Sequence, residues 1–219
     1  MPFAYADYWS LATAQVAAEA AATVAFALSG LIEAARKKLD AVGVCVVAGL
    51  AAFGGGTLRD ILLDRRPFFW VEHAWWLWVL LALCAGAMLF MRSRHLEPTA
   101  RAAQWPDALG LGLFAAGGTQ IALAASMPAI VAVLMGVVTA VFGGVLRDIV
   151  CNEIPRAFRD HQPYAVCGFA GAWVLVLLEP LAGSGIALLA GAATATLLRG
   201  LVLLTGWKLP AWQADGADH

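Results

Sequence analysis

The amino-acid sequence predicts an all-α integral membrane protein with seven transmembrane helices, and three observations support this prediction. The first is composition, because 62% of the 219 residues are hydrophobic and 13% are charged, which is implausible for a soluble domain of this length. The second is the recurrence of apolar segments of helical length along the chain. The third is an internal repeat with a constant offset of 88 residues. Together they predict one membrane domain over residues 1–219, with two copies of a three-helix unit and one additional helix.

Seven apolar segments are long enough to be transmembrane helices. A helix needs about 20 residues to cross the roughly 30 Å hydrocarbon core of a bilayer. Transmembrane strands would instead need segments of about 10 residues with alternating polarity, a pattern that this sequence lacks. The expected spans cover residues 11–32, 41–62, 74–91, 108–126, 129–150, 164–178 and 186–204.

The internal repeat relates the first three spans to the next three without a gap. A unit with an odd number of spans enters the membrane in opposite directions in its two copies. We therefore expect an inverted pair, 8–91 and 105–180, around a pseudo-two-fold axis in the membrane plane. The helix over 184–206 lies outside this symmetry, and 207–219 form a cytoplasmic tail. The register aligns Phe26 with Phe114, Gly30 with Gly118, Gly55-Gly56 with Gly143-Gly144, Arg59-Asp60 with Arg147-Asp148, Pro67 with Pro155 and His73 with His161.

The distribution of positive charge predicts the orientation. With seven spans, the face that holds the N-terminus carries three arginines, whereas the opposite face carries 11 Lys and Arg residues. Loops rich in Lys and Arg stay in the cytoplasm. We therefore expect the N-terminus outside and the C-terminus in the cytoplasm.

Each repeat contains a glycine run inside an apolar segment. Gly54, Gly55 and Gly56 lie in the second span, and Gly143 and Gly144 lie in the fifth. Glycine costs a helix roughly 1 kcal/mol relative to alanine. In inverted repeats such segments are often broken helices whose unwound backbone faces a polar cavity. We expect breaks here that give an ion path free carbonyl groups, and the alternative is that the glycines permit close helix packing.

An Arg-Asp pair follows each glycine run at membrane depth, where ionisable side chains are expensive and usually functional. Side chains of neighbouring residues on a helix point about 100° apart and pair poorly. We therefore expect Arg59 to meet Asp148, and Arg147 to meet Asp60. On the functional hypothesis the aspartates bias a path toward cations and the arginines act as partners or gates. The alternative is two ordinary ion pairs near helix ends.

Glu19 and a basic cluster complete the candidate residues. Glu19 lies inside the first span and is a candidate to line the path, the alternative being a protonated or hydrogen-bonded glutamate between helices. Arg36, Lys37 and Lys38 follow that span. They are the cytoplasmic charge signal, and a second role is contact with anionic lipid headgroups.

Several functional classes find no support in the sequence. The net charge of -1 and the absence of a recognition motif argue against nucleic-acid binding. The chain has no nucleophile elbow, no His/Glu metal-ligand pattern and no phosphate-binding loop, so we expect no enzyme. We expect no cofactor, and no metal beyond a transient monovalent cation.

With these motifs the sequence resembles the trimeric intracellular cation (TRIC) channels, in particular their prokaryotic members. The resemblance rests on Phe-Ala-Leu-Ser-Gly at 26–30, Arg-Lys-Lys-Leu-Asp at 36–40, the first glycine motif through 70, and the second through 155. It implies a multi-pass protein of the inner membrane that forms a homotrimer with one path inside each protomer. It also implies conduction of potassium, with sodium as a second ion, and kinks at the glycines of helices two and five.

A secondary transporter of a small amino acid such as glycine is the rival hypothesis. Inverted repeats and broken helices are a common transporter architecture. The positive end of a half-helix near Gly54 to Gly56 would then hold the substrate carboxylate, assisted by Arg59 or Arg147. The sequence alone leaves the two alternatives open.

Overall fold

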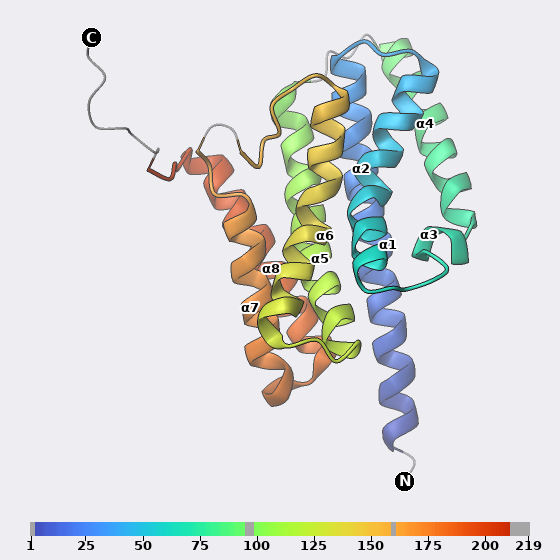
Figure 1. Cartoon of the computed structure of the whole chain (residues 1–219). Coiled ribbons are helices and arrows are strands. Elements are labelled where there is room, and N and C mark those ends of the chain that lie inside the picture. Colours follow the sequence, from blue (N-terminus) through green and yellow to red (C-terminus); the bar gives the residue numbers. More distant parts are fainter. Residues whose placement is uncertain (1–2, 95–98, 159–160, 211–219) are drawn as a thin grey trace.

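The computed structural model describes residues 3–94, 99–158 and 161–210, and its regular structure over these ranges is entirely helical (Figure 1). This confirms the all-α prediction. Most of the predicted tail, residues 211–219, lies outside the described residues. The helices in chain order are α1 (Phe3–Arg36), α2 (Ala41–Leu62), α3 (Phe69–Glu72), α4 (Trp75–Arg94), α5 (Ala100–Ala124), α6 (Ala129–Val150), α7 (Ala165–Ala182) and α8 (Ser184–Thr205).

Six of the described helices are long and apolar enough to cross a membrane: α1 from Gln15, α2, α5 from Arg101, α6, α7 and α8. The apolar part of α4, Trp75–Leu89, is shorter than a full span. The short α3 has four residues and leads the chain from the end of α2 into α4. The chain is thus a multi-pass membrane protein whose third expected span is the least complete.

Helix caps and turns explain where several elements begin. Asp40 caps α2 because its carboxylate accepts a hydrogen bond from the backbone N–H of Gly43 at 2.7 Å. Thr99 caps α5 in the same way through the N–H of Ala102. Gly183, between α7 and α8, has φ +81°, a conformation that other residues rarely adopt.

The helices form a bundle with α5 at its centre (Figure 1). Helix α5 packs against α1, α6, α7 and α8, while α2 packs against α1 and α6. Helices α3 and α4 flank α2 on one side, and α7 and α8 form the opposite side (Figure 1). Helices α1 and α5 run in opposite directions, as do α2 and α6. The boundaries proposed for the two repeats remain a prediction.

The two ends of the bundle differ in the loops that they carry (Figure 1). We call the end with residues 37–40, 151–158 and 161–164 the basic end. The end with residues 63–74 and 125–128 is the N-terminal end, because α1 begins there.

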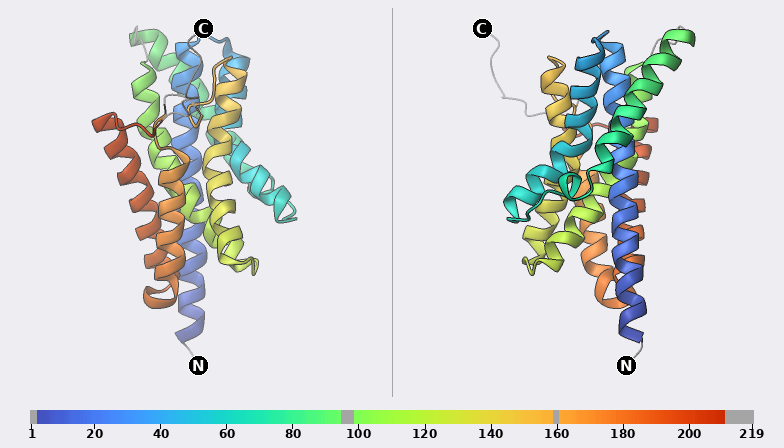
Figure 2. Two further views of the ribbon diagram at one scale, coloured as in Figure 1. Left: turned by 60° about the vertical axis from the view of Figure 1, so that its left-hand side comes forward. Right: turned by 90° about the vertical axis from the view of Figure 1, so that its right-hand side faces the viewer.

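Helices α2 and α6 cross at their glycines and stay helical there. The helical assignment runs without interruption through Gly54–Gly56 and Gly143–Gly144, so the expected unwound breaks are wrong. Figure 2 shows α2 as a bent helix in both views. A Cβ atom at Gly55 would lie 1.9 Å from the carbonyl oxygen of Thr139, and one at Gly143 would lie 2.3 Å from that of Ala51. The glycines therefore let two backbones touch, as the packing alternative proposed.

Candidate functional site

The first candidate site is centred on Arg59, near the C-terminal end of α2. Arg59 is fully buried, and its Nη1 donates a hydrogen bond to Glu19 Oε1 at 2.7 Å. Its Nε donates to Asp60 Oδ1 at 2.9 Å. Nη2 lies 2.8 Å from the same oxygen but outside hydrogen-bond geometry, so this contact is an ion pair without a directional bond. We call Glu19, Arg59 and Asp60 the Arg59 site.

Asp60 also fixes the chain that follows α2. Its Oδ2 accepts a hydrogen bond at 3.1 Å from the backbone N–H of Phe69, the first residue of α3. The Phe69 ring in turn lies 5.7 Å from the guanidinium carbon of Arg59, a cation–π distance. Arg65, whose side chain is 44% exposed, lies 3.6 Å from Asp60 Oδ1. One carboxylate thus holds an arginine and a loop in place.

The second candidate site is centred on Arg147, near the C-terminal end of α6. Arg147 is buried, and its Nη1 lies 2.5 Å from Asp107 Oδ1 on α5. Its Nε donates to Asp148 Oδ1 at 2.8 Å. Ser29 of α1 accepts a further hydrogen bond from Nη1 at 2.6 Å. Asp107, Arg147 and Asp148 form the Arg147 site.

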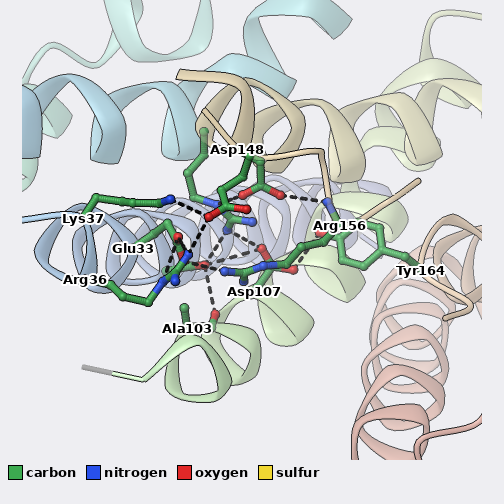
Figure 3. Close-up of polar contacts among 11 residues, drawn as sticks. Glu33, Arg36, Lys37, Ala103, Asp107, Asp148, Arg156 and Tyr164 are labelled. Carbon is green, nitrogen blue, oxygen red and sulfur yellow. Dashed lines mark hydrogen bonds and ion pairs between the residues drawn. The ribbon is translucent and has the colours of Figure 1, made fainter. Parts of the chain in front are cut away.

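Two residues from the loop before α7 close this site. The backbone N–H of Arg156 donates to Asp148 Oδ2 at 2.9 Å, and the hydroxyl of Tyr164 donates to Asp107 Oδ2 at 2.7 Å (Figure 3). Burial, and then the negative charge of Asp107, raise the pKa of Tyr164 well above its ordinary value. The phenol therefore stays protonated and keeps donating at neutral pH.

The expected cross-repeat pairs, Arg59 with Asp148 and Arg147 with Asp60, are wrong. Each arginine pairs with the aspartate that follows it in the chain. The cross-repeat pairs were predicted because the side chains of neighbouring residues leave a helix in directions about 100° apart. A long arginine side chain can fold back far enough for its guanidinium to reach the next carboxylate.

Each arginine has a second carboxylate partner from the helix that precedes it in its half of the chain. Glu19 of α1 serves Arg59, and Asp107 of α5 serves Arg147. Glu19 and Asp107 are 88 residues apart, the offset of the internal repeat. The repeat therefore indicated Asp107 as the equivalent of Glu19, although Asp107 was not among the predicted site residues. Ser29 and Tyr164 had no such signal, because their partners come from distant parts of the chain.

A second layer of ion pairs lies between the Arg147 site and the basic end of the bundle (Figure 3). Glu33, which is 1% exposed, pairs with both Arg36 and Arg156. Glu153 pairs with Lys37 at 2.5 Å and with Arg36 at 3.3 Å. Two members of the predicted basic cluster are thus tied to carboxylates, whereas Lys38 is exposed. A cavity of about 170 Å³ borders this layer and is lined by Glu33, Arg36, Gln104, Asp148, Glu153, Ile154 and Arg156.

The predicted glycines lie between and beside the two sites. Gly54 and Gly56 are tightly packed, since added Cβ atoms would lie 2.7 Å from Leu146 and 2.4 Å from Phe69. A Cβ at Gly144 would have more room, lying 3.4 Å from the Tyr164 hydroxyl oxygen and 3.7 Å from Asp107 Oδ1.

Each site joins one buried arginine to two carboxylates, a formal charge of -1 when these three groups are ionised. At the Arg59 site the partly exposed Arg65 adds a second arginine, 3.6 Å from Asp60 Oδ1. Between the sites the helices are in tight contact at the glycine crossing, and Phe26 stacks on Phe114 with ring centroids 5.5 Å apart. The arrangement is therefore two charged sites separated by a packed layer.

Comparisons with known proteins agree with this architecture. A family model described as glycine transporter matches residues 16–94 and 104–180. A UPF0126 membrane protein from Vibrio cholerae is 37% identical over 181 residues, which cover 81% of this chain and 74% of that protein. The UPF0126 inner membrane protein YadS of Escherichia coli K12 is 35% identical over 153 residues, or 68% of this chain and 72% of that protein.

Solved structures of channels are similar over nearly the whole chain. The TRIC trimeric intracellular cation channel orthologue from Rhodobacter sphaeroides superposes with a TM-score of 0.82 and 34% identity, covering 89% of this chain and 100% of that chain. The chain therefore belongs to the UPF0126 membrane proteins, whose family model is described as glycine transporter, and is a prokaryotic member of the TRIC family.

Proposed function

We propose that each protomer conducts monovalent cations, with a preference for potassium, along a path that joins the Arg59 site to the Arg147 site. The observation that carries this proposal is that each site joins two carboxylates to a single buried arginine inside a membrane domain. Charged groups inside a membrane domain are costly and usually mark a pathway. The solved relatives, described as cation channels, support the same function.

In this proposal the ion passes where α2 and α6 now touch. The carbonyl oxygens of Ala51 and Thr139 lie against the opposing glycines, Gly143 and Gly55. Each of these oxygens accepts one bond within its own helix and keeps a second lone pair. When the two helices separate, this lone pair can replace part of the hydration shell of a cation. The carboxylates of Glu19, Asp60, Asp107 and Asp148 attract cations to the two ends of the path, while Arg59 and Arg147 hold the carboxylates and act as gates.

We base the proposed orientation, cellular location and oligomeric state on the distribution of positive charge and on the relatives. The basic end faces the cytoplasm of a prokaryotic cell, across the inner membrane, since positively charged loops stay inside. Lys38 and the partly exposed Arg36 and Lys37 then lie at the depth of anionic lipid headgroups. Three copies form a symmetric trimer, as the name of the Rhodobacter sphaeroides relative indicates for that protein.

Transport of a small amino acid such as glycine is the second candidate, favoured by the description of the matching family model. In that mechanism Arg147 or Arg59 would hold the substrate carboxylate, and the packed crossing would be one barrier of an alternating-access cycle. Both arginines already have two carboxylate partners, so a substrate would have to displace one of them.

One pair of measurements separates these functions. Purified protein in planar bilayers under a potassium gradient should give unitary currents that reverse near the potassium potential. The variants Asp60→Asn and Asp148→Asn should reduce these currents. In parallel, liposomes are loaded with glycine and tested for counterflow of the labelled amino acid. Silent bilayers together with saturable counterflow would overturn the channel and establish the transporter.

A further inference from the structure

Helix α8 contributes a buried arginine that neither proposed repeat contains. Arg199 is 3% exposed, and in the described part of the chain no carboxylate lies within ion-pair distance of it. A charged group in such a position is expensive unless other groups compensate it. Its interactions therefore indicate why α8 carries it.

All the described partners of Arg199 belong to the segment that leads into α7. Its Nη1 donates to the backbone carbonyl of Pro163 at 3.2 Å and to Gln162 Oε1 at 3.3 Å. Its guanidinium carbon lies 5.0 Å from the centre of the Tyr164 ring, which is a cation–π distance. Just after α8, the backbone N–H of Leu209 donates to the carbonyl of His161. Helix α8 and the residues after it thus hold residues 161–164.

This segment connects Arg199 to the Arg147 site. Tyr164 is 4% exposed and has Arg199 against its ring, while its hydroxyl donates to Asp107 Oδ2 at 2.7 Å. Asp107 in turn binds Arg147 through its other oxygen. The connection therefore runs from α8 through Tyr164 and Asp107 to the arginine of the site.

The Arg59 site has no equivalent connection among the described residues. The position 88 residues before Tyr164 is Trp76, which stacks on Trp75 with ring centroids 3.9 Å apart. The described side-chain partner of Glu19 is Arg59. The additional helix thus supports one site of the pair.

We propose that Arg199 is a positioning residue that holds Tyr164 on Asp107, so that α8 locks the Arg147 site and controls the opening of the basic end. The gating part of this proposal rests on the proposed cation conduction. The positioning part concerns the packing of residues 161–164 and does not depend on conduction.

Cys167 is a reporter for the positioning part. Its Sγ donates to the carbonyl of Pro163 at 3.3 Å, and the side chain is 3% exposed. In a background with the other cysteines, Cys45, Cys84 and Cys151, changed to alanine, a membrane-impermeant maleimide reports how often this segment opens. Arg199→Leu should accelerate labelling by roughly tenfold or more, since tenfold is the low end of the range for one hydrogen bond with a charged partner.

Further variants separate positioning from a general loss of structure. Tyr164→Phe should also accelerate labelling. Both changes break the same connection from Arg199 through Tyr164 to Asp107, so labelling of the double variant should be accelerated by less than the product of the two single factors. Arg199→Lys keeps the charge over the ring and should restore part of the protection. Thr194→Val is the matched control on α8, since this hydroxyl bonds within its own helix to Ala190.

Two results would overturn the positioning role: unchanged labelling in Arg199→Leu, or single effects that multiply in the double variant. The gating part predicts a higher open probability for Arg199→Leu and Tyr164→Phe in planar bilayers, and an unchanged open probability would overturn that part. Silent bilayers with the unmodified protein, together with saturable counterflow of glycine, would instead refute the conduction proposal, and the labelling result would still decide the role of Arg199.

Discussion

The Arg59 and Arg147 sites use the same three charged positions in different surroundings. Glu19, whose side chain is 17% exposed, bonds to Arg59, and Arg65 approaches Asp60 from the surface. Asp107 is 3% exposed and receives additional bonds from other elements of the fold. One charge pattern is thus kept at both sites, while the surrounding elements make the Arg147 site the more tightly enclosed of the two.

A substitution at the packed crossing between the sites gives one of the two largest predicted effects. Gly55→Ala should lower the free energy of unfolding by about 3 kcal/mol or more, because the new Cβ would overlap the Thr139 carbonyl 1.9 Å away. Thermal unfolding in detergent measures this change. Gly117→Ala is the matched control, since a Cβ there meets nothing within 4 Å and alanine favours a helix by up to about 1 kcal/mol. Equal melting temperatures for the two variants would refute the close crossing.

Removal of each arginine tests the difference between the sites directly. Arg147→Met should cost about 3–5 kcal/mol, because it leaves the carboxylates of Asp107 and Asp148 buried without their cation. Arg59→Met should cost less, about 1–3 kcal/mol, since Glu19 can reach water and Arg65 remains near Asp60. Chemical or thermal unfolding gives both values. An Arg59 variant that is the less stable of the two would reverse the comparison.

Removal of the Tyr164 hydroxyl should lower the free energy of unfolding by a smaller amount, and this loss should depend on pH. Tyr164→Phe removes its bond to Asp107 and should cost about 1.5–3 kcal/mol, the range for hydrogen bonds to charged groups. Since folding raises the pKa of Tyr164, its contribution is complete below the unfolded tyrosine pKa of about 10 and is lost as pH rises toward the folded value. Melting curves from pH 8 to about 11 should therefore converge for the two proteins. A constant gap would contradict this assignment.

Much of the fold follows from sequence features that act locally. Hydrophobic length predicts membrane helices, and the expected spans 41–62 and 129–150 coincide with α2 and α6. The constant 88-residue offset places the two Arg-Asp pairs in equivalent positions. The prediction of unwound backbone at the glycines was wrong. A glycine run both lowers helix propensity and permits close helix packing, so the sequence is compatible with either outcome. Tertiary contact decides between these effects.

The side-chain partners of the buried arginines were harder to predict than the helices, for physical reasons. Asp107 lies just before the expected span 108–126, which placed it at the membrane surface, whereas α5 begins at Ala100 and takes Asp107 into the core. The bonds of Tyr164 and Arg199 join elements that are distant in sequence. The side-chain direction of Arg59 depends on rotamers, which periodicity does not contain.

The reversal potential under a potassium chloride gradient tests the central claim most directly. Glu19→Gln combined with Asp107→Asn removes one negative charge from each site and leaves each arginine with its neighbouring aspartate. Asp64→Asn is the matched control, an exposed carboxylate in the loop after α2 whose φ of +51° suits asparagine. We predict a potential near that of potassium for the unmodified protein and the control, and a shift toward zero for the double variant. An unshifted reversal potential in the double variant, with currents of normal size, would contradict the claim that these two carboxylates select cations.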